Sequence, residues 1–285
     1  MHELSIFLAV VFATTCLGII SISSFHNKYL FVPSMVVLMS VLGIHGPSII
    51  TIIMHAWDSN IAAYWTLCLC ACAIIFPYIP RKRISIVRKF FHALVICMFA
   101  PLVVFKKGDV FVTVAGLIVL SFMILIETMR ISFPKLAVSK RISLAFKPVL
   151  DKKDSAKVLI TSHMELLVAC LGPVWISTLF PTSAFFQQAT VRLSGLITVG
   201  VGDSLAAIVG ISCRRPHKIS KTGKSWEGSI AFVVSVLASL YSMNSGLSFQ
   251  AVMATLAAGA AECCARDHDN ILIPLVFIAV YFIAP

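Results

Sequence analysis

Apolar residues recur along this chain of 285 residues in long blocks that short polar segments separate. Runs of roughly 17–25 mostly apolar residues are long enough to cross about 30 Å of hydrocarbon as α-helices. A soluble helical protein with a large core would show narrower amphipathic stripes instead. The pattern therefore predicts an all-α, polytopic integral membrane protein with about ten transmembrane helices, at residues 4–22, 30–54, 61–80, 90–105, 110–127, 158–180, 191–211, 229–244, 248–264 and 270–284.

The composition agrees with a membrane protein. The chain is 59% hydrophobic and only 12% charged, and its mean hydropathy is +0.97. A soluble domain carries about 25% charged residues, so this chain has about half the charge that solubility usually requires.

The basic residues gather on one side of the predicted spans. With the ten spans in alternation, all of the 23 Lys and Arg residues except Lys106, Lys107 and Arg192 fall on one face. The positive-inside rule places the basic loops 81–89, 128–157 and 212–228 in the cytosol. This placement accounts for the net charge of +11 by topology, so no nucleic-acid partner is predicted. The long loop 128–157 is expected to contain a partly amphipathic interfacial helix after Pro134.

The chain divides in function near residue 80. Residues 1–80 are predicted to form transmembrane helices of unclear role, whereas polar residues accumulate throughout 81–285. The nine cysteines show no zinc-ligand spacing with suitable partners, and neither a metal site nor a disulfide is predicted from them.

Four acids lie within or at the ends of the predicted spans, where a charged side chain costs roughly 2.5–3.5 kcal/mol unless it is paired or hydrated. They are Glu127, Glu165, Asp203 and Glu262. Asp203 follows Gly200 and Gly202, and two interpretations of these glycines stand open. Bare backbone amides beside a carboxylate suit a phosphate–Mg²⁺ group, but small residues also allow close helix packing in membranes.

A basic loop follows this segment at 214–228. Five cations, several hydroxyls and two glycines within fifteen residues are typical of a polyphosphate-binding loop. Gly223-Lys224-Ser225 resembles the end of a P-loop, but Lys218 stands where that motif requires glycine, so a P-loop ATPase is excluded. The sequence thus predicts a nucleotide-binding segment at 199–228.

This segment resembles the CTP-binding signature of the dolichol kinase family, D-x-x-A-x-x-x-G-x-x-x-G, eight residues, then K-K-T-x-E-G. Asp203, Ala206 and Gly210 match at the required spacing, and Lys224, Glu227 and Gly228 match after the eight-residue gap. Ser225 replaces threonine conservatively. Arg214 stands at the third-position glycine and Gly223 at the first lysine, and Lys221 or Arg215 lies close enough in sequence to restore that positive charge.

Three further stretches resemble the same family, in the family's order over 81–285. Arg88-Lys89-Phe90-Phe91-His92 is similar to its R-K-x-x-H element, and Asp151-Lys152-Lys153-Asp154-Ser155 is similar to its acidic-basic-acidic loop. Glu262 with Asp269-Asn270 resembles its final polar cluster.

The resemblance implies transfer of the γ-phosphoryl group of CTP to the terminal hydroxyl of dolichol, with Mg²⁺ or another divalent cation as cofactor. Asp203 is then expected to hold the metal, Lys224 to neutralise phosphate oxygens, and Glu227 to orient Lys224 or hold metal. The proton acceptor stays open among Asp203, Glu227 and Asp154. The remaining nucleotide-binding candidates are Gly200, Gly202, Ser204, Gly210, Arg214, Arg215, Lys218, Lys221, Gly223, Ser225 and Gly228, and accessory or phosphate-side candidates are Arg88, His92, Asp151, Asp154, Glu262 and Asp269.

Two other classes of function remain open from the sequence. One is another membrane isoprenoid-alcohol kinase or a CTP:lipid cytidylyltransferase, and the other is a transporter with Glu127, Glu165 and Asp203 as an ion relay. The family resemblance implies a multi-pass protein of the endoplasmic reticulum membrane whose nucleotide site faces the cytosol. CTP and the isoprenoid lipid are the expected partners, and no protein partner is predicted.

Overall fold

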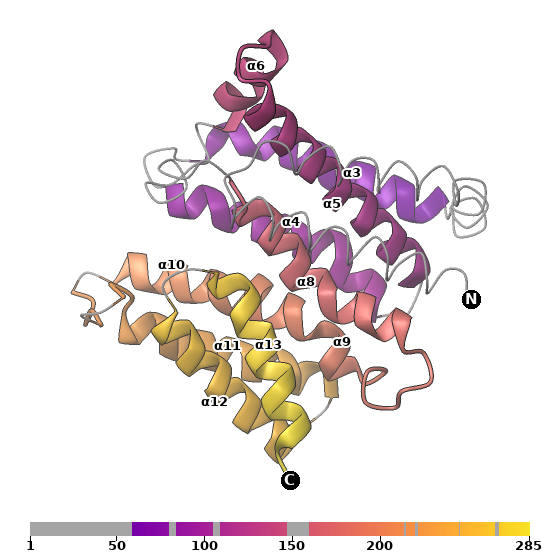
Figure 1. Ribbon diagram of the computed structural model, residues 1–285. Helices are drawn as coiled ribbons and strands as arrows, with labels where there is room; N and C mark the ends of the chain where they lie inside the picture. The colour runs from indigo at the N-terminus through magenta and orange to yellow at the C-terminus, as the bar shows by residue number, and fades with distance from the viewer. Residues whose placement is uncertain are drawn as a thin grey trace. The chain divides into compact units, whose positions relative to one another are not determined.

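The computed structural model describes residues 59–79, 84–104, 109–146, 160–213, 215–219, 222–244, 246–265 and 268–285. Within these residues the chain is helical, and the one β-type contact is an isolated antiparallel bridge between Lys218 and Ser225. The all-α prediction is therefore confirmed for the described part of the chain (Figure 1).

Every predicted span that falls on described residues coincides with helix. These helices are α3 (Ser59–Ile75), α4 (Ile84–Val104), α5 (Asp109–Ser132), α8 (Ser162–Leu179), the continuous run of α9 (Ala189–Gly195), η3 (Leu196–Asp203) and α10 (Ser204–Ser212), then α11 (Trp226–Asn244), α12 (Phe249–Cys264) and α13 (Asp269–Ile283).

Among the described residues, six helical segments are long and apolar enough to cross a membrane, which is consistent with an integral membrane protein. The helices α12 and α13 are apolar but shorter, with 16 and 15 residues. The predicted spans 4–22 and 30–54 lie outside the described residues, so the total of ten stays a prediction.

The loop 128–157 contains the expected additional helix. α5 continues to Ser132, a turn follows around Pro134, and α6 (Ala137–Phe146) begins three residues later. Lys140 and Arg141 are exposed, and the buried Ser139 donates a hydrogen bond of 3.1 Å to the carbonyl of Met129, which holds α6 against the end of α5.

The chain forms two compact units that interleave along the sequence. One unit comprises the residues up to Ala63 with Gly108–Met164, and the other comprises Tyr64–Lys107 with Glu165–Pro285. The predicted functional division near residue 80 is a different boundary and stays a prediction. All of the candidate-site residues that the structure describes lie in the second unit.

In this second unit α12 packs between α11 and α13 (Figure 1). Phe232, Val236 and Leu240 are fully buried and recur every fourth residue, so they line one face of α11. The facing residues of α12 are small: Ala254 and Ala258 are fully buried, and a Cβ on Gly259 would lie 2.8 Å from Val233. Small residues at helix interfaces let the backbones approach closely.

Candidate functional site

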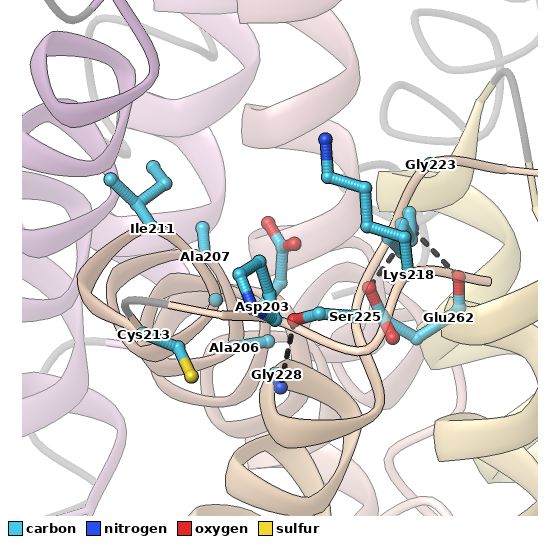
Figure 2. A pocket seen from close by; sticks show the side chains of 13 residues that line it. Asp203, Ala206, Ala207, Ile211, Cys213, Lys218, Gly223, Ser225, Gly228 and Glu262 are labelled. Carbon is cyan, nitrogen blue, oxygen red and sulfur yellow. Dashed lines mark hydrogen bonds and ion pairs between the residues drawn. The ribbon is translucent and has the colours of Figure 1, made fainter.

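A pocket of about 500 Å³ opens beside α10, within the size range of roughly 300–1,000 Å³ that is typical of small-molecule sites. Figure 2 shows Asp203, Ala206 and Ala207 on one side of this pocket and Glu262 on the other. The lining residues come from η3, α10, the segment 213–225 and the first turns of α11, with Glu262 from α12: Asp203, Ala206, Ala207, Gly210, Ile211, Cys213, Pro216, Lys218, Gly223, Lys224, Ser225, Gly228 and Glu262.

Asp203 reaches this pocket from the middle of one long helical segment. It is the last residue of η3, whose eight residues are π-helical, and α10 continues directly after it. π-helical turns are rare and are frequently found at functional sites. The Asp203 side chain is largely buried and forms an ion pair with Lys89, and Nε2 of His92 lies 3.4 Å from the same carboxylate oxygen.

Gly200 and Gly202 lie on faces of η3 that pack against other helices. A Cβ on Gly200 would lie 2.6 Å from the Ile96 side chain, and one on Gly202 would lie 2.7–2.9 Å from Val236 and Phe232. Both glycines are outside the pocket lining. Of the two interpretations left open by the sequence, close helix packing accounts for these contacts.

The basic loop folds back on itself as a short hairpin. Lys218 bridges Ser225, the Ile219 amide donates to the Lys224 carbonyl at 2.8 Å, and the Trp226 amide donates to the His217 carbonyl at 3.1 Å. Gly223 turns the chain with a φ of +73°, a conformation that glycine adopts without steric cost. The turn thus gives a physical reason for glycine at a position where the family signature has lysine.

Ser225, Gly228 and Gly210 join the hairpin to α11 and α10. The Ser225 hydroxyl accepts a hydrogen bond of 3.2 Å from the Gly228 amide, which is the geometry of a helix N-cap. A Cβ on Gly228 would lie 2.7 Å from the Ala206 carbonyl oxygen, and one on Gly210 would lie 2.8 Å from the Ser225 hydroxyl. These positions of the signature therefore start α11 and bring it against α10 beside the pocket.

Replacing Ser225 by Ala is expected to destabilise the protein by about 0.5–2 kcal/mol, because the first turn of α11 loses its cap. Ser225→Thr should keep nearly full stability, since threonine caps a helix in the same way. Thermal unfolding of both variants in the same detergent tests this expectation. Equal melting temperatures for the two variants would contradict the capping role.

Lys224 extends to the junction of α12 and α13. Its Nζ lies 2.7 Å from the Glu262 carbonyl oxygen, 3.0 Å from Glu262 Oε1 and 3.1 Å from Asp269 Oδ2. Ser229 donates a hydrogen bond of 2.9 Å to the other carboxylate oxygen of Glu262. Burial alone would lower the pKa of Lys224, but the carboxylates of Asp269 and Glu262 together raise this pKa above the ordinary value for lysine. Lys224 is therefore held as a charged group.

Glu227 binds the start of the hairpin instead of Lys224. Its carboxylate accepts a hydrogen bond of 3.1 Å from the His217 amide, and Oε1 lies 2.7 Å from Nδ1 of the His217 ring. The expected role of orienting Lys224 is filled in the structure by Glu262 and Asp269. Glu227 lies outside the pocket lining.

The remaining candidate residues differ in whether they line the pocket. Lys218 lines the pocket as an exposed side chain, and Arg215 is exposed outside it. Ser204 is buried next to Asp203 but does not line the pocket. His92 is buried, and its Nδ1 lies 2.9 Å from the Arg88 carbonyl oxygen. Four candidates lie outside the described residues: Arg214, Lys221, Asp151 and Asp154.

Lys89 is a site residue that the sequence analysis quoted within the R-K-x-x-H element but did not select as a candidate. That reasoning selected Arg88 and His92, which are four residues apart, whereas Lys89 and His92 are three residues apart and also share a helix face. The structure turns the Lys89–His92 face toward Asp203. Two polar residues on one face of an apolar helix are the signal that would have found Lys89.

The pocket offers carboxylate oxygens of the kind that Mg²⁺ prefers. Mg²⁺ keeps several waters and is usually bound by one or two carboxylates together with substrate phosphates. Asp203 and Glu262 both line the pocket, and no group of three or more His, Cys, Asp or Glu side chains is placed to hold a metal within the described ranges. The donor set therefore fits a cation that is held mainly by the phosphates of a nucleotide.

Comparison with known proteins finds relatives that share one name. The chain is 30% identical over 200 residues to dolichol kinase sec59 of Schizosaccharomyces pombe, covering 68% of this chain and 38% of the relative. It is 30% identical over 241 residues to dolichol kinase EVAN of Arabidopsis thaliana, covering 78% and 40%, and 26% identical over 238 residues to dolichol kinase of Homo sapiens, covering 76% and 43%. The chain thus spans about two fifths of the length of these relatives. No protein-family model and no solved structure matches it.

Proposed function

We propose that this chain, which is homologous to the dolichol kinases over more than two thirds of its length, transfers the γ-phosphoryl group of CTP to the terminal hydroxyl of dolichol. The observation that carries the proposal is the shared name of relatives from a fungus, a plant and mammals. The product would be dolichyl phosphate, made at the cytosolic face of the endoplasmic reticulum membrane.

The proposed reaction requires positioning and charge neutralisation more than covalent help from the protein. The alcohol oxygen forms a new bond to the γ-phosphorus, and the bond to the bridging oxygen breaks with its electron pair leaving on CDP. The hydroxyl proton leaves to water at the pocket rim, where Lys218 and Gly223 are exposed. Lys218 and Asp203 supply charges on the wall along which the triphosphate would lie, and Lys89 forms an ion pair with Asp203.

Asp203 is the pocket residue whose carboxylate would hold a divalent cation, because both carboxylate oxygens of Glu262 are already bound by Lys224 and Ser229. A bound Mg²⁺ would neutralise charge on the phosphate oxygens. The second carboxylate oxygen of Asp203 would be the one that meets the cation, because Lys89 and His92 lie at the first.

The surface of α10 supports a lipid acceptor. Ala206 and Ala207 line the pocket, while Leu205, Ile208 and Val209 on the same helix are exposed apolar side chains. In a membrane-spanning chain such side chains would face hydrocarbon. An isoprenoid alcohol therefore has an apolar route to the helix that carries Asp203.

The test is phosphate transfer to dolichol by the purified chain in detergent, with γ-labelled CTP and ATP in parallel, each with and without Mg²⁺. We expect label in dolichyl phosphate from CTP with Mg²⁺ only. Transfer of label to shorter prenols but not to dolichol would show that the acceptor is a shorter isoprenoid alcohol instead of dolichol. Release of pyrophosphate would identify a cytidylyltransferase, and no transfer by folded protein would refute a kinase function.

A further inference from the structure

Two lysines lie within reach of the pocket's carboxylates, and their surroundings differ. Lys224 is the lysine that the signature motif contains, whereas Lys89 comes from α4 and contacts Asp203. Which of the two meets a phosphate group depends on the charge around each ammonium and on the N–H groups that it has left to donate.

The ammonium of Lys224 already has an oxygen partner for each of its N–H groups. A lysine ammonium has three N–H donors, and three oxygens from Glu262 and Asp269 lie within 2.7–3.1 Å of Nζ. One cation between two carboxylates leaves this cluster with a net charge of −1. A triphosphate that approached Lys224 would therefore meet net repulsion and would have to displace an existing partner.

The contacts of Lys224 stabilise the packing of the hairpin against α12 and α13. Glu262 lies in the last turn of α12, where carbonyl groups lack partners inside the helix, and a lysine there satisfies one of them and interacts favourably with the helix dipole. Asp269 is the first residue of α13. Lys224 thus ties the hairpin to the end of one helix and the start of the next.

The ammonium of Lys89 is not saturated in this way. In the part of the chain that the structure describes, its ion pair is with one carboxylate oxygen of Asp203, and this pair is neutral. His92 beside the same oxygen adds either no charge or a positive one. Asp203 lines the pocket, so a phosphate oxygen next to this carboxylate arrives within reach of Lys89 without meeting net negative charge.

We propose that Lys89 is the cation that contacts the terminal phosphate of the nucleoside triphosphate, and that Lys224 is a positioning residue that holds the hairpin against α12 and α13. This assignment rests on the proposed kinase function. It adds a phosphate-binding residue from α4, more than a hundred residues before the signature.

Equilibrium binding of CTP and CDP separates the two roles, because only CTP carries the terminal phosphate. In Lys89→Gln the amide still donates to Asp203 while the charge is removed, and Lys224→Gln is the matched change at the other lysine. We expect Lys89→Gln to reduce the preference for CTP over CDP at least about tenfold, the effect of a lost charge-assisted hydrogen bond, and Lys89→Arg to retain that preference. Lys224→Gln should lower the melting temperature and weaken binding of both nucleotides by the same factor.

Chemical modification of lysine in the unsubstituted protein gives a second measurement that needs no variant to fold. CTP with Mg²⁺ should protect Lys89 from acylation more than CDP does, whereas Lys224, which lines the pocket, should be protected equally by the two nucleotides. Loss of the CTP preference in Lys224→Gln at unchanged melting temperature, or CTP-specific protection of Lys224, would overturn the assignment. Failure of the folded wild-type chain to bind either nucleotide would instead refute the proposed function.

Discussion

Asp203→Asn is expected to lower phosphoryl transfer by at least about a hundredfold, the scale seen when one charge-stabilising group is removed from an active site. Asparagine keeps the shape of the side chain and a hydrogen-bond acceptor for Lys89, but it removes the negative charge that would hold a divalent cation. The fold should survive, so the melting temperature should change little compared with the rate. Initial rates with CTP and dolichol in detergent, alongside thermal unfolding, give both quantities.

Asp109→Asn is the matched control for this change. Asp109 lies in the first turn of α5, in the other compact unit, and is not part of the pocket lining. The same chemical change there should leave the rate within about twofold, as is usual for substitutions away from a site. Full activity in Asp203→Asn would refute a metal-holding or phosphate-side role for Asp203.

Gly195→Ala is expected to produce a large loss of stability for a single added methyl group. The new Cβ would lie 1.9 Å from the Ala169 carbonyl oxygen and 2.9 Å from its carbonyl carbon. These atoms belong to the backbone of α8 and cannot rotate away, so the helices must separate. Overpacking of this kind costs about 1–3 kcal/mol or more, and the segment that shifts is the one that carries Asp203.

Gly172→Ala is the comparison for Gly195→Ala, because Gly172 lies in α8 only three residues after Ala169. Nothing lies within 4 Å of a Cβ at this position, and alanine favours a helix over glycine by up to about 1 kcal/mol. Gly172→Ala should therefore melt at or above the wild-type temperature. Equal melting temperatures for the two variants would disprove the close contact of Gly195 with α8.

The membrane architecture could be predicted because each apolar block is a local signal. The helices α4, α5 and α8 all lie where the hydropathy pattern placed spans, and α6 begins three residues after Pro134. Boundaries were less predictable: α5 continues past the expected end at 127, because Glu127 pairs with Arg130 at 2.6 Å and stays buried inside the last turns of the helix. A charged pair one turn apart can extend an apolar helix beyond its apolar residues.

The candidate site could be predicted only where its residues are close in sequence. The hairpin and its glycine turn lie within one continuous segment, and the signature located them. The partners of its charged groups could not be predicted, because Lys224 meets Glu262 and Asp269, which follow it by 38 and 45 residues. Lys89 and Asp203 are 114 residues apart. Such pairs are fixed by how helices pack, which a single sequence does not encode locally.

Of the two roles that the sequence left open for Gly200 and Gly202, the structure supports helix packing for a physical reason. Gly200 and Gly202 precede a carboxylate, a spacing that suits a phosphate loop, yet in a continuous helix their amide groups are occupied by the helix itself. Because Gly200 and Gly202 have no side chain, Ile96 and Phe232 can pack closely against η3. The glycine that does adopt a turn conformation is Gly223, at a position where the signature has none.

The short helices α12 and α13 would thin the bilayer around them wherever they cross it. At about 1.5 Å per residue their 16 and 15 residues span roughly 24 and 22 Å, less than the hydrocarbon thickness of about 30 Å. A bilayer accommodates such a mismatch by thinning around the short segments. The corner between the two helices carries Glu262 and Asp269, so a thinner leaflet there shortens the distance between the aqueous phase and the lipid's hydroxyl end. Under the proposed function, a long-chain alcohol in that leaflet would meet a water-soluble donor while its tail stays in the membrane, and the protein would not have to extract it.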